Sequence, residues 1–201
     1  MKIVHTETIQ SCGEYVKSEH WRKIRKEIHD AVGKCEWPVG TGKFVINPGE
    51  HANGVVPIKK RFVEGLRKEG WTIEGKAKNS LGEALGDFDA VKEGPFGPII
   101  AEWETGNISS SHRSMNKITL LVSDEVIAAG VLVVPSRKLY PYLTDRIGNI
   151  RELNPYLKLW KSVPCKSGII EIVVIEHDAT SSKVPHIPKG KDGNAKRQSS
   201  M

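Results

Sequence analysis

Two glutamates, Glu102 and Glu104, stand one residue apart at the end of the apolar run Ile99-Ile100-Ala101. Successive side chains of a β-strand point to opposite faces, so a strand here should place both carboxylates on one face. Like charges at that spacing repel unless a cation, a shared proton or solvent separates them. Oxygen ligands at close range suit Mg²⁺. The pair therefore predicts a metal site or, as the plainer alternative, a solvated strand edge.

A serine-rich segment follows this strand directly. After the turn residues Gly106 and Asn107, residues 109–122 begin with serines and then carry apolar side chains three and four residues apart. Serines in a first turn and this apolar spacing are typical of an amphipathic helix. We expect the helix to begin beside the two glutamates, with Ser109 as a candidate cap.

Other elements must hold this strand in place. Apolar spacing predicts helices over 19–32 and 58–69 and shorter helical pieces over 138–142 and 149–159. Apolar and β-branched runs predict strands over 44–46, 71–74, 88–91, 98–104, 128–134 and 168–175. The expected fold is α/β, a mixed central β-sheet flanked by helices. Residues 1–180 form the predicted core, and the Ser-, Pro-, Gly- and Lys-containing residues 181–201 form a flexible basic C-terminal arm.

The charge and cysteine content narrow the class of protein. The 201 residues include 30 Lys and Arg against 24 Asp and Glu, a formal net charge of +6, which favours a polyanionic partner. Cys12, Cys35 and Cys165 are odd in number and form no Cys-x-x-Cys pair, which argues against a zinc site and for a reducing compartment. Without a signal-like segment or a long apolar run, we expect a soluble intracellular protein without a membrane partner.

A resemblance to a known family sharpens this picture. The stretch Glu102–Lys117 resembles the catalytic strand and following helix of the BamHI family of restriction endonucleases, within the PD-(D/E)xK nuclease superfamily. Three more blocks resemble that family in the same order, namely Asn53–Lys59, Tyr142–Arg146 and Val184–Gly193. Around 76–85 and 93–98 the sequence differs, and the chain is shorter there.

The resemblance implies a set of metal ligands. Asp89 would be the central ligand in preference to Asp87, Glu102 the second, and the main-chain carbonyl of Trp103 would complete one position. Glu74 would join Asp89 at a second position, with Glu83 as its rival and a plain surface glutamate as the alternative. Glu104 would accept a proton from the attacking water. The implied cofactor is Mg²⁺, two ions per active site, with Mn²⁺ able to substitute.

The resemblance also implies how DNA would be read. The matched DNA-facing residues are Lys59, Asn107, Ser109, Arg113, Asp145, Arg146, Gly190 and Asp192. The plainer alternatives for three of them are a turn residue at 107, a helix cap at 109 and a surface charge at 113. Arginine can bind guanine bidentately while an acidic side chain accepts from cytosine, so Asp145-Arg146 can describe one G·C pair.

The predicted function is therefore that of a type II restriction endonuclease from a prokaryotic cytoplasm. The implied target is double-stranded DNA at the palindrome GGATCC, cut after the first G to leave 5′ overhangs. A palindrome implies a homodimer, and a companion DNA methyltransferase would act on the same site. Two alternatives are a DNA-binding regulator without catalysis and a structure-selective repair or resolving nuclease.

Overall fold

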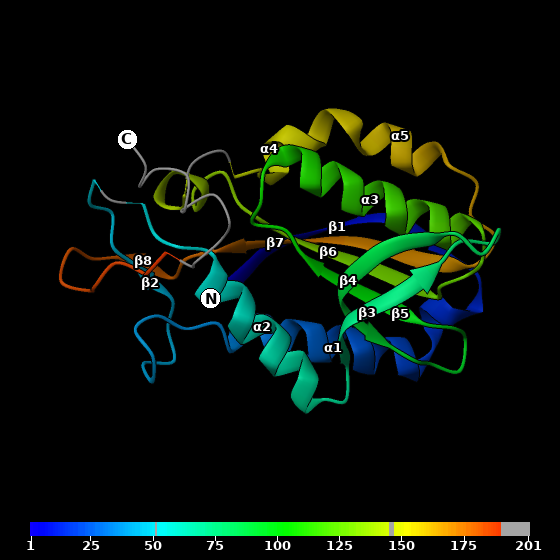
Figure 1. Ribbon diagram of the computed structural model, residues 1–201, viewed down its shortest axis with the longest axis horizontal. Coiled ribbons are helices and arrows are strands. Elements are labelled where there is room, and N and C mark those ends of the chain that lie inside the picture. Colours follow the sequence, from blue (N-terminus) through cyan, green and yellow to red (C-terminus); the bar gives the residue numbers. More distant parts are fainter. Residues whose placement is uncertain (51, 145–146, 190–201) are drawn as a thin grey trace, which may run out of the picture.

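A six-stranded sheet forms the centre of the computed structural model, which describes residues 1–50, 52–144 and 147–189 (Figure 1). Its strand order is β1-β7-β6-β5-β4-β3, with β5, β6 and β7 parallel and the remaining pairs antiparallel. The strands are β1 (Lys2–Cys12), β3 (Thr72–Lys78), β4 (Ala84–Lys92), β5 (Ile99–Trp103), β6 (Ala129–Pro135) and β7 (Gly168–Glu176). Two short strands, β2 (Val45–Ile46) and β8 (Ala179–Thr180), pair beside it. The predicted mixed sheet is confirmed.

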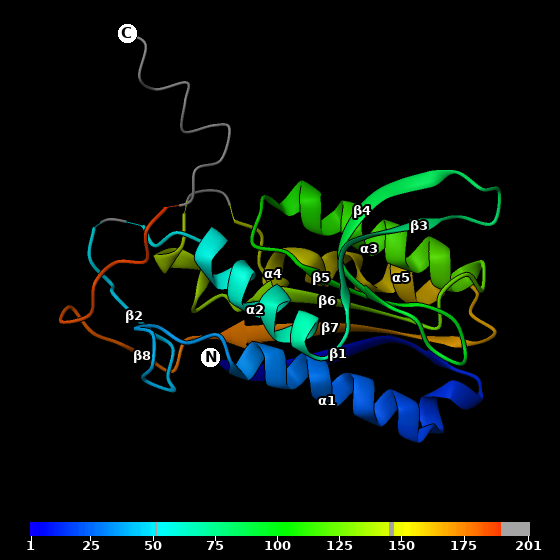
Figure 2. The ribbon, with the colours of Figure 1, turned by 60° about the horizontal axis from the view of Figure 1, so that its bottom comes forward.

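Helices cover both faces of this sheet (Figures 1 and 2). On one side lie α1 (Glu19–Gly33) and α2 (Val56–Lys68), and on the other α3 (Ile108–Ser123), α4 (Ile150–Leu153) and α5 (Leu157–Ser162). The side chains of β5 alternate between these layers: Ala101 and Trp103 pack with α1 and α2, whereas Ile100 packs with α3. By the same alternation Glu102 faces α3.

The helix expected after the glutamates is present as α3. Its N-cap is Asn107, whose side chain accepts a hydrogen bond from the backbone N–H of Ser110, so the candidate cap at Ser109 is wrong. Met115, Ile118 and Leu121 are fully buried and attach the helix to the sheet. Helix α3 therefore starts at the end of β5 and runs back along its face.

Helical structure after β6 is more broken than predicted. The piece expected over 138–142 is a single 3₁₀ turn, Tyr140–Tyr142. The piece expected over 149–159 divides into α4, a 3₁₀ turn at Asn154–Tyr156 and α5. Proline lacks a backbone N–H to donate, so Pro155 at the start of that turn accounts for the break. A further 3₁₀ turn, Glu14–Lys17, precedes α1.

Strand β1 was missed by the sequence analysis. It pairs along its length with β7, from Lys2 opposite Glu176 to Cys12 opposite Gly168. Register irregularities between Ile3 and His5 and between Thr8 and Gln10 interrupt its two-residue alternation. The many β-branched residues of this segment were the available signal.

The first part of the predicted arm packs on the core. Ile187 is 2% exposed, its N–H donates to Asn53 Oδ1 and its carbonyl accepts from the N–H of Gly54. A side chain at Gly54 would meet the main chain of Pro188. Residues 181–188, which the sequence analysis assigned to the arm, therefore lie against the core. Two blocks that carry the family resemblance, far apart in sequence, pack together here.

Candidate active site

The site lies where strands β4 and β5 separate. Their backbone ladder pairs Ala90 with Ala101, and the next residues continue it with side chains. The N–H of Asp89 donates to Glu102 Oε2 at 3.0 Å, and the N–H of Trp103 donates to Asp89 Oδ2 at 2.8 Å. Two carboxylates are thereby fixed at one end of the sheet, and Asp89, not its rival Asp87, lies beside Glu102.

A lysine from each helical layer pairs with one of these carboxylates. Lys59, in the first turns of α2, places Nζ 2.5 Å from Asp89 Oδ1. Lys117, on α3, places Nζ 3.3 Å from Glu102 Oε1. The lysine side chains are 44% and 14% exposed, respectively. The acidic pair is therefore balanced by cations of the chain itself.

Glu104 follows β5 directly and completes the acidic group. Its N–H donates to the carbonyl of Val133 on β6, which carries the β5–β6 ladder one residue beyond the strand. Its Oε1 lies 3.0 Å from Ser114 Oγ, and the same hydroxyl lies 3.3 Å from Glu102 Oε1. Because one side chain of α3 contacts both carboxylates, the prediction that they share a face is confirmed.

The surroundings favour the neutral forms of both glutamates. Burial, and after it the charge of Asp89, raises the pKa of Glu102 above its ordinary value. Burial likewise raises the pKa of Glu104, with the hydrogen bond from Ser114 opposing it and the charge of Glu102 adding to it. A cation placed here would offset this cost by stabilising the charged forms.

Glu74 lies on the strand next to Asp89. The register places it between the pairs Ile73–Ala90 and Gly75–Phe88, which sets it across from Asp89. Its side chain is exposed and its φ of +56° lies in the left-handed region, which is uncommon for a residue other than glycine. The register brings Glu74 to the edge of the site, and within the described part of the chain no hydrogen bond or ion pair joins its side chain to Asp89, Glu102 or Glu104.

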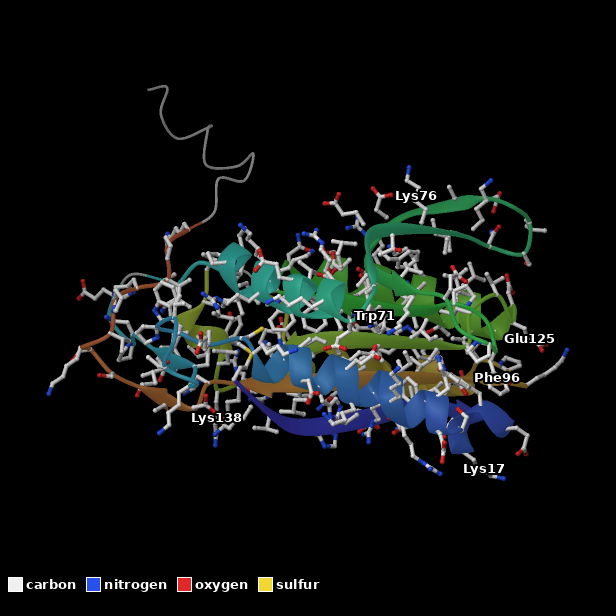
Figure 3. All side chains as sticks on the ribbon, turned by 90° about the horizontal axis from the view of Figure 1, so that it is seen from below. Lys17, Trp71, Lys76, Phe96, Glu125 and Lys138 are labelled. Atoms are coloured by element: carbon white, nitrogen blue, oxygen red, sulfur yellow. The ribbon has the colours of Figure 1, made fainter. Side chains whose placement is uncertain are left out.

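Glu83 lies at the far end of the β3–β4 hairpin. There its carboxylate accepts a hydrogen bond from Asn79 Nδ2 at 2.7 Å. At about 3.3 Å per strand residue, the six residues to Asp89 span roughly 20 Å, so Glu83 does not share a site with Asp89. The hairpin extends from the body of the molecule, with Lys76 pointing outward from it (Figure 3).

The carboxylate oxygens of the site are of the type that binds a hard divalent ion, although those of Asp89 and Glu102 already have other partners. Carboxylates of Asp89, Glu102 and Glu104 are the ligand types that Mg²⁺ takes. Within residues 1–50, 52–144 and 147–189, no group of three or more His, Cys, Asp or Glu side chains is arranged to hold a metal ion. The Asp89 and Glu102 side chains instead bind backbone N–H groups and lysines. Binding a cation would require these side chains to rearrange.

Of the predicted DNA-contacting residues, Lys59 and Arg113 lie beside this acidic group, and Asn107 and Ser109 lie at the start of α3. Lys59, Glu104 and Arg113 line one cavity of about 300 Å³. Ser109 and Arg113 also border a second cavity of about 500 Å³ over α3, and both side chains are exposed. Asn107 is exposed as well and caps α3 with its side-chain oxygen. Asp145, Arg146, Gly190 and Asp192 lie outside the described residues.

Two residues of the site were not singled out from the sequence. Ser114 and Lys117 lie within the matched block but were given no role. Ser114 precedes the buried Ile118 by four residues, so its position on the inner stripe of α3 was the available signal. A polar residue on an apolar stripe that ends at two carboxylates is a candidate partner for them.

Comparison with known proteins agrees with this geometry. The family model described as restriction endonuclease BamHI matches residues 1–194. The chain is 46% identical over 174 residues to the type II restriction enzyme OkrAI of Oceanobacter kriegii, covering 87% of this chain and 90% of the relative. It is 36% identical over 182 residues to the type II restriction enzyme BamHI of Bacillus amyloliquefaciens, covering 85% and 82%.

Solved structures give the same fold. The BglII restriction endonuclease in complex with a DNA 16-mer aligns with a TM-score of 0.62 at 12% identity, covering 96% of this chain and 91% of that one. Free BglII aligns with a TM-score of 0.55 at 9% identity, covering 89% and 81%. At these identities the likeness concerns the fold.

The fold and the relatives together define the class, a type II restriction endonuclease, which is a site-specific deoxyribonuclease. Within that class the chain belongs to the BamHI family of restriction endonucleases. In the part of the chain that the structure describes, no helix has the length and apolarity to cross a membrane.

Proposed function

We propose that this enzyme cleaves double-stranded DNA at the palindrome GGATCC, after the first G of each strand, leaving four-base 5′ overhangs. The observation that carries the proposal is the convergence of Asp89, Glu102 and Glu104 where β4 and β5 separate. The specificity is supported by the block Glu102–Lys117, which resembles the BamHI family, and by the 36% identity to BamHI itself.

Asp89 and Glu102, with the main-chain carbonyl of Trp103, would hold one Mg²⁺ ion. Glu74, across the sheet from Asp89, would join it in holding a second, and Mn²⁺ can substitute. When bound, such ions lower the pKa of a coordinated water and stabilise the charge that develops on the phosphate. The neighbouring lysines would then be free to meet phosphate oxygens.

Glu104 would accept the proton of the attacking water. A carboxylate with a raised pKa is a stronger base than an ordinary glutamate, which suits this role. Its neighbour in the same cavity, Lys59, carries a positive charge on a side chain that is nearly half exposed and can reach a DNA phosphate. When DNA binds, Lys59 would thus leave its ion pair with Asp89 and contact a phosphate instead.

Sequence reading would be divided between α3 and two segments outside the described residues. Asn107, Ser109 and Arg113 lie exposed at the start of α3, within reach of a major groove laid over the site. Asp145 and Arg146 would read one G·C pair between them. Gly190 and Asp192 belong to the arm, which would enter the minor groove.

The enzyme would act as a homodimer in a bacterial cytoplasm. A palindrome read symmetrically requires a two-fold axis, with one active site for each strand. The self-DNA of such a cell must be protected, so a methyltransferase acting on the same sequence is the expected companion.

The test is a digestion of long duplex DNA of known sequence. Purified enzyme with Mg²⁺ should give discrete fragments, and sequencing of their ends should place every cut after the first G of GGATCC. The matched controls are the same DNA with each GGATCC changed by one base pair, and the enzyme with a chelator. Neither control should be cut.

Other outcomes separate the alternatives. Discrete fragments with ends at a different sequence would agree with a type II restriction endonuclease but overturn the proposed GGATCC specificity. Cutting confined to junctions or branched DNA would indicate a structure-selective nuclease. Tight binding to GGATCC with no cutting under any divalent ion would indicate a DNA-binding regulator.

A further inference from the structure

One serine of α3 lies between the two catalytic candidates of β5. Ser114 is 2% exposed, and its Oγ lies 3.0 Å from Glu104 Oε1 and 3.3 Å from Glu102 Oε1. A hydroxyl carries one proton, so it donates to one carboxylate at a time. Which carboxylate receives the proton depends on the other donors that each one has.

Glu102 has donors besides Ser114. Its Oε2 accepts the N–H of Asp89, and its Oε1 faces the ammonium group of Lys117. That ammonium group is itself held in place, 3.3 Å from the carbonyl oxygen of Asp87 and 4.0 Å from the centre of the Phe88 ring. The charge of Glu102 is therefore compensated without the serine.

Glu104 depends on Ser114. Within the described part of the chain, the serine hydroxyl is the one hydrogen-bond donor to the Glu104 carboxylate, and it lies nearer to Glu104 than to Glu102. We propose that Ser114 is a positioning residue, which fixes the Glu104 carboxylate through Oε1 and leaves Oε2 to face the attacking water. This inference rests on the proposed role of Glu104 as proton acceptor.

The location of Ser114 on α3, next to Arg113, adds a consequence. Arg113, the neighbouring residue, is exposed on the cavity that Glu104 also lines. A helix moves as a unit. A shift of α3 that brings Arg113 into contact with DNA would therefore also move the Ser114 hydroxyl with respect to Glu104. The orientation of Glu104 is thereby tied to the placement of α3.

A matched control lies one turn earlier on the same helix. Ser111 is fully buried, and its Oγ has no hydrogen-bond partner among the residues that the structure describes. Replacing either serine by alanine removes one buried hydroxyl from the inner side of α3. Only Ser114→Ala removes a contact to a carboxylate of the site, so any difference between the two variants reports that contact.

The experiment combines crystal structures without metal and single-turnover cleavage of a GGATCC duplex. In Ser114→Ala we expect the Glu104 side chain to leave its single orientation, and cleavage to slow by about 10–100-fold, the usual effect of losing a group that orients an active-site side chain. Affinity for DNA without metal should stay within about twofold. Ser111→Ala should match the wild type in all three measurements.

Two results would overturn the proposal. One is an unchanged Glu104 orientation in Ser114→Ala together with cleavage within threefold of the wild type. The other is an equal loss of cleavage in both serine variants, which would indicate a packing role. If wild-type enzyme fails to cut GGATCC, the proposed specificity fails instead, and the orientation of Glu104 in the two variants still decides the role of Ser114.

Discussion

The backbone N–H of Asp89 donates to the carboxylate of Glu102, one residue beyond Ala90 and Ala101, the last backbone-paired residues of β4 and β5 at this end. The N–H of Trp103 returns a bond to Asp89 in the same manner. Two acidic side chains thus continue the pairing of β4 and β5 beyond the backbone ladder, and the strands can part without leaving these N–H groups unpaired. The strands therefore separate at the candidate catalytic carboxylates.

Removing the carboxylate of Glu102 should separate cleavage from binding. We expect Glu102→Ala to abolish cleavage of GGATCC, because it deletes a proposed metal ligand. Affinity for the same duplex without metal should hold or improve, because a negative charge beside the scissile phosphate is lost. Gel-shift and single-turnover assays measure the two properties.

The alanine variant also leaves the partly buried Lys117 and the N–H of Asp89 without this carboxylate, so a more conservative variant is tested beside it. Glu102→Gln keeps the shape and one acceptor oxygen, and it should show the same loss of cleavage with a native circular dichroism spectrum. If this variant cleaves at a tenth of the wild-type rate or more, the assignment of Glu102 as a metal ligand is contradicted.

Lys59 should contribute to binding through phosphate. We expect Lys59→Met to weaken cognate and non-cognate DNA alike and to lower the salt slope of log K by about one for each subunit. Lys60→Met is the matched control, since Lys60 is more exposed and lies 3.9 Å from Glu64 on the same helix. A change of base preference in Lys59→Met, or equal effects from both lysines, would contradict the assignment.

The carboxylate of Glu104 should reduce the stability of the metal-free protein. Burial raises its pKa above the ordinary 4.5, so the cost of the charged form to stability is present at neutral pH, fades as the pH falls through the raised pKa, and is gone below 4.5. Glu104→Gln should therefore have a higher urea midpoint than the wild type at pH 7.5, and the difference should shrink as the solution is acidified. A lower midpoint at pH 7.5 would show that the charge is well accommodated.

Two C-terminal deletions should behave differently. Removing residues 190–201 should leave the unfolding temperature nearly unchanged and weaken specific DNA binding. Removing 181–201 should cost about 3 kcal/mol more, because it also takes away the buried Ile187 and its two hydrogen bonds to Asn53 and Gly54. Equal stability of the two truncated proteins would place the whole segment outside the core.

Much of the fold follows from local patterns in the sequence. Apolar spacing placed α1 within a residue of its observed end, because Trp21, Ile24, Ile28 and Val32 form one buried stripe. Strand β1 escaped notice because two irregularities in its pairing break the alternation on which strand prediction depends. Pro155 divided a helix that periodicity alone predicts as continuous.

The site was predictable in part. Two-residue alternation was enough to place Glu102 and Glu104 together, whereas Asp89 rested on the family resemblance. The partners of these carboxylates were not accessible from spacing, because Lys59 and Lys117 arrive from helices on opposite faces of the sheet. Packing of residues 184–188 on 53–54 was also missed, since the Ser, Pro, Gly and Lys content of the whole segment 181–201 is typical of a mobile arm, and the contacts are long-range.

Cleavage of two short duplexes under single-turnover conditions tests the central claim most directly. One duplex contains GGATCC, the other differs from it by one base pair, and both are mixed with excess enzyme and Mg²⁺. We predict cutting of both strands after the first G of GGATCC, at least about a hundredfold faster than any cutting of the altered duplex. Equal rates on the two duplexes, or cuts at another position, would contradict the account.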